Sequence, residues 1–179
     1  MTVQTRTGQP VIETARFDLR PLRASDAGLI ALYAGDYRVA SMTRSIPHPL
    51  PPGAAEGFVG RALSDQRVED VWAMDATRHG GPELMGVIAL ERMDREQSEL
   101  GYWVGPAFWN TGFAQEAVRA LVAANPLRQT AMFASVFQDN AASARVLTQC
   151  GFAYLGDAEA YSVARGAKVG TWTYTRKLD

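Results

Sequence analysis

The segment from Leu100 to Val118 has the residue types of an anion-binding turn. An apolar strand pattern runs into a short glycine-bearing loop, and a helix pattern follows directly after Gly112. Glycine lets another group approach the main chain closely. The first amides of a helix have no partner inside the helix, and the helix dipole attracts negative charge to them. The spacing therefore predicts a phosphate site that needs no basic side chain, although a routine strand-to-helix connection has the same pattern.

A second helix pattern, from Asp139 to Phe152, carries two polar side chains on its apolar face. Ser143 belongs to the apolar stripe by its spacing, and Asn140 lies one turn earlier on the same face. Polar groups on an inward face need hydrogen-bond partners, which either a ligand or the protein can provide. Asn140 also suits the cap position of a helix, so a purely structural role stays open.

Taken in order, these two segments resemble the GCN5-related N-acetyltransferases, the GNAT family. The first reads Trp-Asn-Thr-Gly-Phe-Ala-Gln-Glu-Ala from Trp109, and the second reads Asn-Ala-Ala-Ser-Ala-Arg-Val-Leu-Thr-Gln-Cys-Gly-Phe from Asn140. The ribosomal-protein N-terminal acetyltransferases are the branch that the chain resembles most. The resemblance includes the opening Leu-Arg-Pro-Leu-Arg from Leu19 and spans Ala15 to Leu178.

The resemblance implies a GNAT-like acyl-CoA N-acyltransferase fold and transfer of an acetyl group from acetyl-CoA to a primary amine, either a protein N-terminal α-amine or a small molecule. It implies that loop amides hold the pyrophosphate and that a strand edge binds the pantetheine arm like an added strand. Asn140 would bind pantetheine, Ser143 would lie by the thioester sulfur, and Arg145 could reach the adenosine phosphates. The implied acetyl-CoA contacts are Trp103, Val104, Trp109, Asn110, Thr111, Gly112, Phe113, Ala114, Asn140, Ser143 and Arg145.

Attack of an amine on a thioester needs a neutral amine, a polarised carbonyl and a proton for the departing thiolate. Glu99 is the candidate base, because it shares a strand face with Gly101, whose missing side chain leaves room for a substrate. A solvated carboxylate is the plainer interpretation of Glu99. Ser143 is the first candidate acid, and the Val104 amide could polarise the carbonyl. The resemblance implies Tyr161 as the second candidate acid, since a tyrosine in the last third of the chain can protonate the sulfur in this family. An α-amine, with a pKa near ~8, would need only water as base.

The loop departs from the family pattern in its charge. Many members of the family carry a basic or amide side chain at the positions of Trp109 and Thr111, whereas this loop has no cation. Glu116, in the first turn of the predicted helix, suits the helix dipole but would repel a phosphate if it pointed inward. The affinity for acetyl-CoA must then depend on the backbone amides.

The composition argues against several classes of protein. The 179 residues carry a net charge of −1 and a pI of about 6.1, without the basic stripe typical of nucleic-acid binding. One cysteine, Cys150, excludes an internal disulfide, and the isolated His48 and His79 do not suggest a metal site. No apolar run is long enough for a membrane span, and the first residues do not look like a signal peptide. We therefore expect a cytoplasmic protein without a metal, nucleic acid or membrane partner, as a monomer or homodimer.

The remaining patterns predict a single α+β domain over residues 14–179, after a flexible arm at residues 1–13. We expect layered α/β packing with a central mixed, mostly antiparallel sheet flanked by helices. Strands are predicted at Thr14–Leu19, Val71–Thr77, Leu84–Glu91, Ser98–Val104, Ala131–Phe137, Ala153–Val163 and Gly170–Leu178. Helices are predicted after the cap residue Ser25, over Asp36–Thr43, Gly53–Leu63, Ala114–Ala124 and Asp139–Cys150.

Two other functions compete with acetyl transfer. A non-catalytic acyl-CoA-binding module would keep the pocket and lose the proton chemistry. A dinucleotide-binding α/β protein is disfavoured, because the sequence has neither G-x-G-x-x-G nor a Walker loop. The loops at residues 45–53 and 157–168 are the expected walls of the acceptor pocket, since binding residues favour loops.

Overall fold

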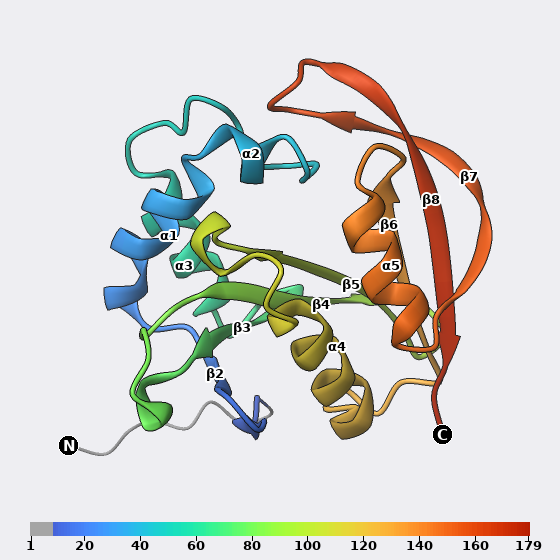
Figure 1. The fold of residues 1–179 in the computed structure, drawn as a ribbon, viewed down its shortest axis with the longest axis horizontal. Coiled ribbons are helices and arrows are strands. Elements are labelled where there is room, and N and C mark those ends of the chain that lie inside the picture. The colour runs from blue at the N-terminus through green and yellow to red at the C-terminus, as the bar shows by residue number, and fades with distance from the viewer. Residues whose placement is uncertain (1–8) are drawn as a thin grey trace.

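An eight-stranded sheet organises residues 9–179, the part of the chain that the computed structural model describes (Figure 1). Its strands are β1 (Ile12–Glu13), β2 (Asp18–Pro21), β3 (Glu69–Asp75), β4 (Gly86–Met93), β5 (Gln97–Val104), β6 (Ala131–Phe137), β7 (Ala153–Ser162) and β8 (Ala167–Lys177). The helices are α1 (Ala27–Ala34), α2 (Tyr37–Ala40), α3 (Ala54–Ala62), α4 (Phe113–Ala124) and α5 (Ala141–Gln149). Neighbouring strands in the order β1-β2-β3-β4-β5-β6-β8-β7 are antiparallel, except that β5 and β6 run parallel. The expectation of a mixed, mostly antiparallel sheet flanked by helices is confirmed.

Helices cover both faces of the sheet, and each face has its own hydrophobic core. One core includes Leu100 and Val104 of β5 and Leu121 of α4. The other core lies against α1 and α3, and Trp103 of β5 packs on it. Successive side chains of a strand point to opposite faces. The even-numbered side chains of β5 therefore face α4 and α5, and the odd-numbered ones face α1 and α3.

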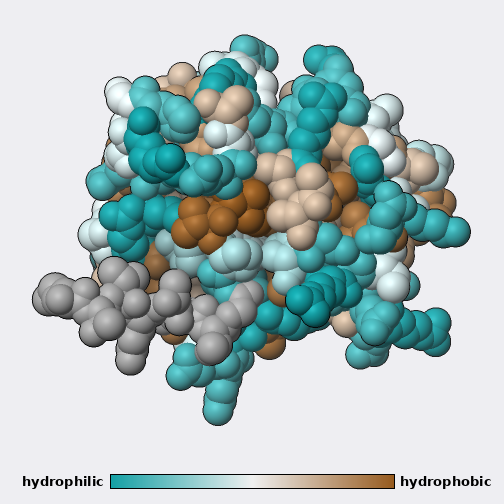
Figure 2. Space-filling view, turned by 90° about the horizontal axis from the view of Figure 1, so that it is seen from below, coloured by the Kyte–Doolittle hydropathy of each residue, from teal (hydrophilic) through white to brown (hydrophobic). Residues whose placement is uncertain are grey.

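The two central strands β3 and β4 are buried on both faces. Every residue from Asp70 to Asp75 is buried, and so is every residue from Gly86 to Leu90. The sequence from Leu84 to Leu90 is almost entirely apolar, which is typical of a strand buried on both faces. The surface seen from below is largely hydrophilic, with hydrophobic residues gathered near its centre (Figure 2). Apolar side chains are thus concentrated between the layers.

The N-terminal segment differs from the sequence-based expectation. Residues 1–8 of the expected flexible arm lie outside the described residues, but Gln9 to Glu13 pack on the sheet. Gln9 Nε2 donates to the Val71 carbonyl at 2.6 Å, and Trp72 Nε1 donates to the Pro10 carbonyl at 2.8 Å. The predicted strand from Thr14 is wrong over residues 14–17, which form a turn between β1 and β2. A fully buried Trp72 needs an acceptor for its indole N–H, and this segment provides it.

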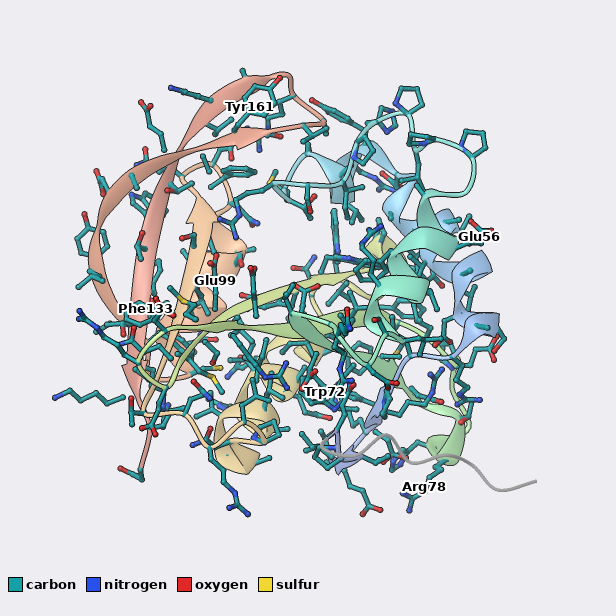
Figure 3. The ribbon with its side chains drawn as sticks, turned by 180° about the vertical axis from the view of Figure 1, so that it is seen from behind. Glu56, Trp72, Arg78, Glu99, Phe133 and Tyr161 are labelled. Carbon is teal, nitrogen blue, oxygen red and sulfur yellow. The ribbon has the colours of Figure 1, made fainter. Side chains whose placement is uncertain are left out.

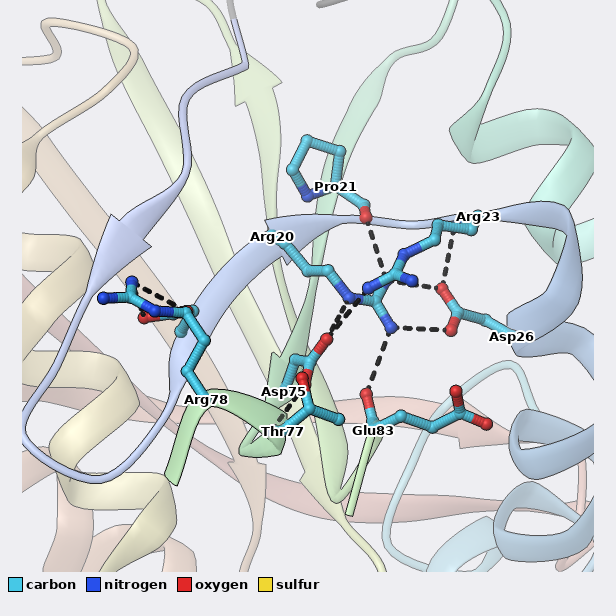
Figure 4. A network of polar contacts seen from close by, with 9 residues as sticks. Arg20, Pro21, Arg23, Asp26, Asp75, Thr77, Arg78 and Glu83 are labelled. Carbon is cyan, nitrogen blue, oxygen red and sulfur yellow. Dashed lines mark hydrogen bonds and ion pairs between the residues drawn. The ribbon is translucent and has the colours of Figure 1, made fainter. Parts of the chain in front are cut away.

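A buried arginine ties the start of α1 to the sheet (Figure 4). Arg20 Nε lies 2.6 Å from Asp75 Oδ2, and its terminal nitrogens lie 2.9 Å from the two oxygens of Asp26. Asp26 also accepts from Arg23 N at 2.7 Å, so Asp26, and not Ser25, caps this turn. Burial raises the pKa of the Asp75 carboxyl, but hydrogen bonds, above all from Arg20, hold it below its ordinary value. The network therefore requires ionised carboxylates.

Replacing Asp75 by Asn is expected to lower the free energy of unfolding by about 3 kcal/mol at neutral pH, because Arg20 keeps its buried charge and loses one partner. The pKa of Asp75 is lower in the folded protein than its ordinary value. The carboxylate therefore contributes fully to the free energy of unfolding at pH values above that ordinary pKa. This contribution is lost as pH falls through the folded-state pKa. Urea unfolding of wild type and Asp75→Asn over a pH series measures both effects. Asp36→Asn at an exposed pair with Arg38 is the control. Equal losses from the two substitutions would contradict this account.

Candidate active site

A cleft opens where β5 and β6 separate. The two strands pair only from Gln97–Glu99 to Ala131–Phe133, whereas β6 pairs with β8 along its whole length. The chain beyond Glu99 therefore diverges from β6. The space between them belongs to a cleft of about 940 Å³ that is also lined by the loop before α4, the first turns of α5 and residues 41–47.

The β5 edge offers main-chain groups to this cleft. Val104 lies opposite Gly86, and Gly105 N donates to the Met85 carbonyl at 2.8 Å. Because main-chain groups alternate in direction along an antiparallel strand, those of Trp103 point to β4, and those of Tyr102 and Val104 point away from it. Of the two residues expected at this edge, Val104 presents its main chain to the cleft and Trp103 presents its side chain.

The loop before α4 has the backbone that the glycine pattern predicts. Asn110 and Gly112 both have a positive φ, of 60° and 80°. The first amide to bond within α4 is that of Glu116, which donates to the Gly112 carbonyl at 3.0 Å. The amides of Phe113, Ala114 and Gln115 precede that bond and lack a helical acceptor. All residues from Asn110 to Gln115 line the cleft.

The indole of Trp109 has a structural contact in addition to its place at the cleft. Its Nε1 donates to the Val104 carbonyl at 2.7 Å, which joins the loop to the end of β5. The guanidinium of Arg38 lies 5.7 Å from the Trp109 ring centroid. Trp109 therefore fixes the loop against the strand edge, and leaves the Val104 amide as the group available to a ligand.

The cation that the loop lacks comes from the β1–β2 turn. Arg16 Nε lies 2.8 Å from Glu116 Oε1, and Arg16 Nη1 donates to the Thr111 carbonyl at 2.9 Å. Glu116 also accepts from Thr14 Oγ1 at 2.7 Å, so its carboxylate points to this turn. Burial raises the pKa of Glu116, but hydrogen bonds from Arg16 and Thr14 hold it below its ordinary value. Arg16 thus neutralises Glu116 and supports the loop, and this pairing removes the expected repulsion of a phosphate.

Ser143 has a partner that the sequence did not indicate. Its Oγ lies 2.8 Å from the Tyr102 hydroxyl, which comes from the even-numbered face of β5. Burial raises the pKa of Tyr102 above its ordinary value. Asn140 Oδ1 accepts from Ser143 N at 3.3 Å, so Asn140 does cap α5, and its side-chain N–H₂ is left for another acceptor. Strand alternation in the sequence indicates that Tyr102 points toward α5. That pattern is the one sequence feature that could have identified Tyr102 as a site residue.

Glu99 lies in the cleft but is not simply solvated. Its Oε1 is 2.5 Å from Arg44 Nη2, and the two side chains are about one quarter and one half exposed. The strand register places Glu69, Glu91 and Glu99 side by side across β3, β4 and β5. Burial first, and then Glu91, raise the pKa of Glu69. The sheet face to which the odd-numbered side chains of β5 point therefore carries three carboxylates, one from each of β3, β4 and β5, beside Arg44.

Tyr161, the second candidate acid, does not join this group. It lies near the tip of the β7–β8 hairpin, apart from Glu99, and it is 56% exposed (Figure 3). It is not among the residues that line the cleft. The physical reason is strand alternation at the sheet edge, because the neighbouring Ser162 takes the buried position. The expectation for Tyr161 is not supported by this geometry.

The outer parts of the cleft agree with other expectations. Arg145, in the first turns of α5, lines the cleft and is exposed. Residues 45–47 and Leu50 of the proline loop also line it, as expected for an acceptor wall, whereas no residue of the other expected wall, 157–168, does. Within residues 9–179, no group of His, Cys, Asp and Glu is arranged to hold a metal ion. Among the same residues, no helix has the length and apolarity of a membrane span.

Residues 16–153 match the family model described as the acetyltransferase (GNAT) domain. The chain belongs to the GNAT family. It is 28% identical over 176 residues to the uncharacterized N-acetyltransferase YoaA of Bacillus subtilis (strain 168), covering 93% of this chain and 96% of that protein. It is an acetyl-CoA-dependent N-acetyltransferase, with acetyl-CoA as cosubstrate and an amine as acceptor.

Two solved structures illustrate the shared fold. Spermidine N-acetyltransferase from Vibrio cholerae, in complex with CoA and spermine, matches with a TM-score of 0.77 and 15% identity, over 92% of this chain and 96% of that chain. The acetyl transfer enzyme of Salmonella typhimurium that modifies the N-terminal serine of ribosomal protein L7/L12 matches with a TM-score of 0.78 and 19% identity, over 95% and 100%. At these identities, the likeness concerns the fold.

Replacing Gly112 by Val is expected to raise the Kd of acetyl-CoA at least tenfold, about 1.4 kcal/mol. The φ of +80° strains any branched side chain, and a Cβ there would lie 3.3 Å from Arg16 Nη2. The substitution therefore displaces the loop amides. Calorimetry measures the Kd, and Gly28→Val, where a Cβ meets nothing within 4 Å, is the matched control. An unchanged Kd in folded Gly112→Val protein would show that the loop amides do not hold the cosubstrate.

Proposed function

We propose that this enzyme acetylates the amino group of a protein N-terminus or of a small molecule, and that Ser143 returns a proton to the sulfur of CoA. The observation that carries the proposal is the 2.8 Å contact between Ser143 Oγ and the Tyr102 hydroxyl, beside the open edge of β5. It joins a proton donor to the strand edge that suits the pantetheine arm. The same cleft continues to Glu99, so one space is lined by groups for both substrates.

The residues present fit acetyl-CoA along the length of the cleft. The amides from Asn110 to Gln115 would bind the pyrophosphate. They line the cleft before the first hydrogen bond of α4, so they are available to an anion. The main chain of Tyr102 would pair with a pantetheine amide as an added strand does, and the Val104 amide is left for the thioester carbonyl because Trp109 occupies the Val104 carbonyl. The Asn140 side-chain amide would contact pantetheine, and Arg145 would pair with the adenosine phosphates. Acetyl-CoA supplies the activated acetyl group.

Tyr102 prepares Ser143 to act as an acid. Since burial raises its pKa, the Tyr102 phenol keeps its proton at neutral pH. The phenol proton has two acceptors within reach, the Ser143 carbonyl at 3.3 Å and the nearer Ser143 Oγ at 2.8 Å. When it is donated to Oγ, the hydroxyl proton of Ser143 is left to point into the cleft. A serine that both accepts from Tyr102 and donates to a departing thiolate becomes a better acid as the thiolate charge develops.

Glu99 is the proposed base for the amine. The ammonium loses one proton to become nucleophilic, its nitrogen bonds to the acetyl carbon, and the carbon–sulfur bond breaks. The nitrogen then loses a second proton, so that the sulfur gains one and solvent receives the other. An α-amine, with an ordinary pKa near ~8, needs little help, and water can then serve in place of Glu99. The Val104 amide is placed at the strand edge to polarise the thioester carbonyl.

The acceptor itself is proposed from the relatives and from charge. Of the two solved structures, one is a spermidine N-acetyltransferase with bound spermine, and the other modifies the N-terminal serine of a ribosomal protein. The carboxylates of Glu69 and Glu99 line the cleft here, beside Arg44 and Arg61. Carboxylates at this end favour the approach of an ammonium group. We place the reaction in the cytoplasm, without nucleic acid, in a monomer or homodimer, as the sequence predicts.

Replacing Ser143 by Ala is expected to lower kcat about 100-fold, because the departing thiolate loses its proton donor. The KM for acetyl-CoA should change little, since Asn140 and the loop remain. Tyr102→Phe should lower kcat less, about tenfold, because water can replace the phenol as donor to Ser143. Steady-state kinetics measures these values. Ser135→Ala, an exposed serine of β6 in the same cleft, is the matched control. Unchanged kcat in Ser143→Ala would exclude the assigned role.

Incubation with acetyl-CoA and a panel of peptide N-termini, polyamines and aminoglycosides tests the whole proposal. Thiol release with at least one amine is the expected result, with mass spectrometry locating the acetyl group on nitrogen. Tight acetyl-CoA binding without thiol release across the panel would instead support a non-catalytic acyl-CoA-binding module. The acceptor with the fastest turnover then identifies the substrate class.

A further inference from the structure

The β7–β8 hairpin extends beyond β6, and its tip lies beside the end of α2 (Figure 1). Its turn has bonds of its own, because Gly166 N donates to the Ser162 carbonyl at 2.8 Å and Arg165 N donates to Ser162 Oγ at 3.3 Å. Val163 N donates to the Arg44 carbonyl at 3.0 Å. The hairpin tip is therefore an ordered segment with a direct bond to the residue that pairs with Glu99.

We propose that Arg165, in this tip, is a positioning residue for the acceptor end of the cleft. Its Nε donates to the Ser41 carbonyl at 2.7 Å, and its terminal nitrogens bind the two oxygens of Asp139 at 2.6 and 3.1 Å. Its Nη2 lies 3.6 Å from Met42 Sδ, and its guanidinium lies 4.9 Å from the Phe137 ring centroid. One side chain thus contacts both sides of the cleft.

The chemistry of this contact suits arginine specifically. The planar fork of a guanidinium can meet a carboxylate with two parallel bonds and keep Nε for a third acceptor. Only 18% of the Arg165 side chain is exposed, whereas 55% of Asp139 is, so solvent screens the bond to the Ser41 carbonyl less than it screens the ion pair. The hydrogen bond from Arg165 also holds the pKa of Asp139 below its ordinary value. The ion pair is therefore present across the neutral pH range.

Arg165 connects two walls that carry the groups proposed for catalysis. We define the arginine wall as residues 41–46, which include Arg44, and the serine wall as residues 137–143, which include Asn140 and Ser143. Within residues 9–179, no direct hydrogen bond joins one wall to the other. The bonds of Arg165 to Ser41 and Asp139 bridge them. The hairpin main chain also bonds to both walls, at Arg44 through Val163 and at Gln138 through Gly170, and the Arg165 bridge adds the side-chain link that fixes the distance between them.

This inference rests on the proposed function, since it concerns where the amine binds. Without the bridge, both walls gain freedom that an acceptor must remove when it binds. The loop before α4 and the edge of β5, which are proposed to hold acetyl-CoA, have no contact with the Arg165 side chain. Asn140, next to Asp139, is the one proposed pantetheine contact close to the bridge, so loss of Arg165 should weaken the use of the amine much more than the use of acetyl-CoA.

Arg165→Ala is expected to raise the KM for the fastest amine of the panel at least about tenfold, since small displacements of binding groups are costly. The KM for acetyl-CoA should stay within about twofold of wild type by the same reasoning. Arg165→Lys should give an intermediate KM, because it keeps the charge and loses the fork. Asp139→Asn removes the ion pair from the other wall and should resemble Arg165→Lys. Arg78→Ala, which removes an exposed arginine and its ion pairs at the opposite end of the molecule, is the matched control (Figure 3).

Hydrogen exchange of the free enzyme tests the bridge without any turnover. The Val163 amide should exchange faster in Arg165→Ala than in wild type or in Arg78→Ala. An unchanged amine KM, an equal rise of both KM values, or unchanged exchange at Val163 would each overturn the inference. If wild type acetylates no amine at all, the proposed function fails, and exchange at Val163 still decides whether Arg165 joins the walls.

Discussion

The short parallel pairing of β5 and β6 is the constraint on which the site depends. Three residue pairs hold the strands together, and β6 then follows β8 instead of β5. The main chain of Tyr102 and the amide of Val104 are left without a neighbouring strand and need another partner, whereas the Val104 carbonyl already accepts from Trp109. A ligand with amide groups can supply it in the same way that a strand would. The affinity for such a ligand comes from the backbone and depends little on which side chains occupy β5.

Two side chains at the loop before α4, those of Trp109 and Arg16, hold the backbone in place. Trp109 fixes the end of β5, and Arg16 holds the loop through the Thr111 carbonyl and Glu116. Glu116 lies at the start of α4, where its charge suits the helix dipole, yet it points away from the cleft. This arrangement keeps the favourable effect of the carboxylate on the helix, while the neighbouring amides stay open to an anion. The cation missing from the loop is replaced by one that stabilises the loop itself.

The sequence predicted local features well and long-range partners poorly. The helical spacing predicted α4 and α5, and Gly112 predicted the turn before α4, because these features depend on residues within one or two turns. Arg16 lies about 100 residues from Glu116, and no local pattern connects the two. Alternation indicates which face of β5 Tyr102 occupies but not that Ser143 meets it there. Tyr161 was assigned from family likeness alone, and the edge position of β7 decided against it.

The two halves of the cleft differ in what holds them together. The half at α4 is formed by the backbone of one continuous segment, from β5 through the loop, so its shape is set within a short stretch of chain. The half at Glu99 is assembled from residues 41–47 and β5, which the Arg44–Glu99 pair connects, and the hairpin tip joins it through the Arg165 side chain and the main-chain bond from Val163 to Arg44. A family that keeps one cosubstrate and changes its amine needs this division. Loops can vary at the second half without disturbing the strand edge of the first.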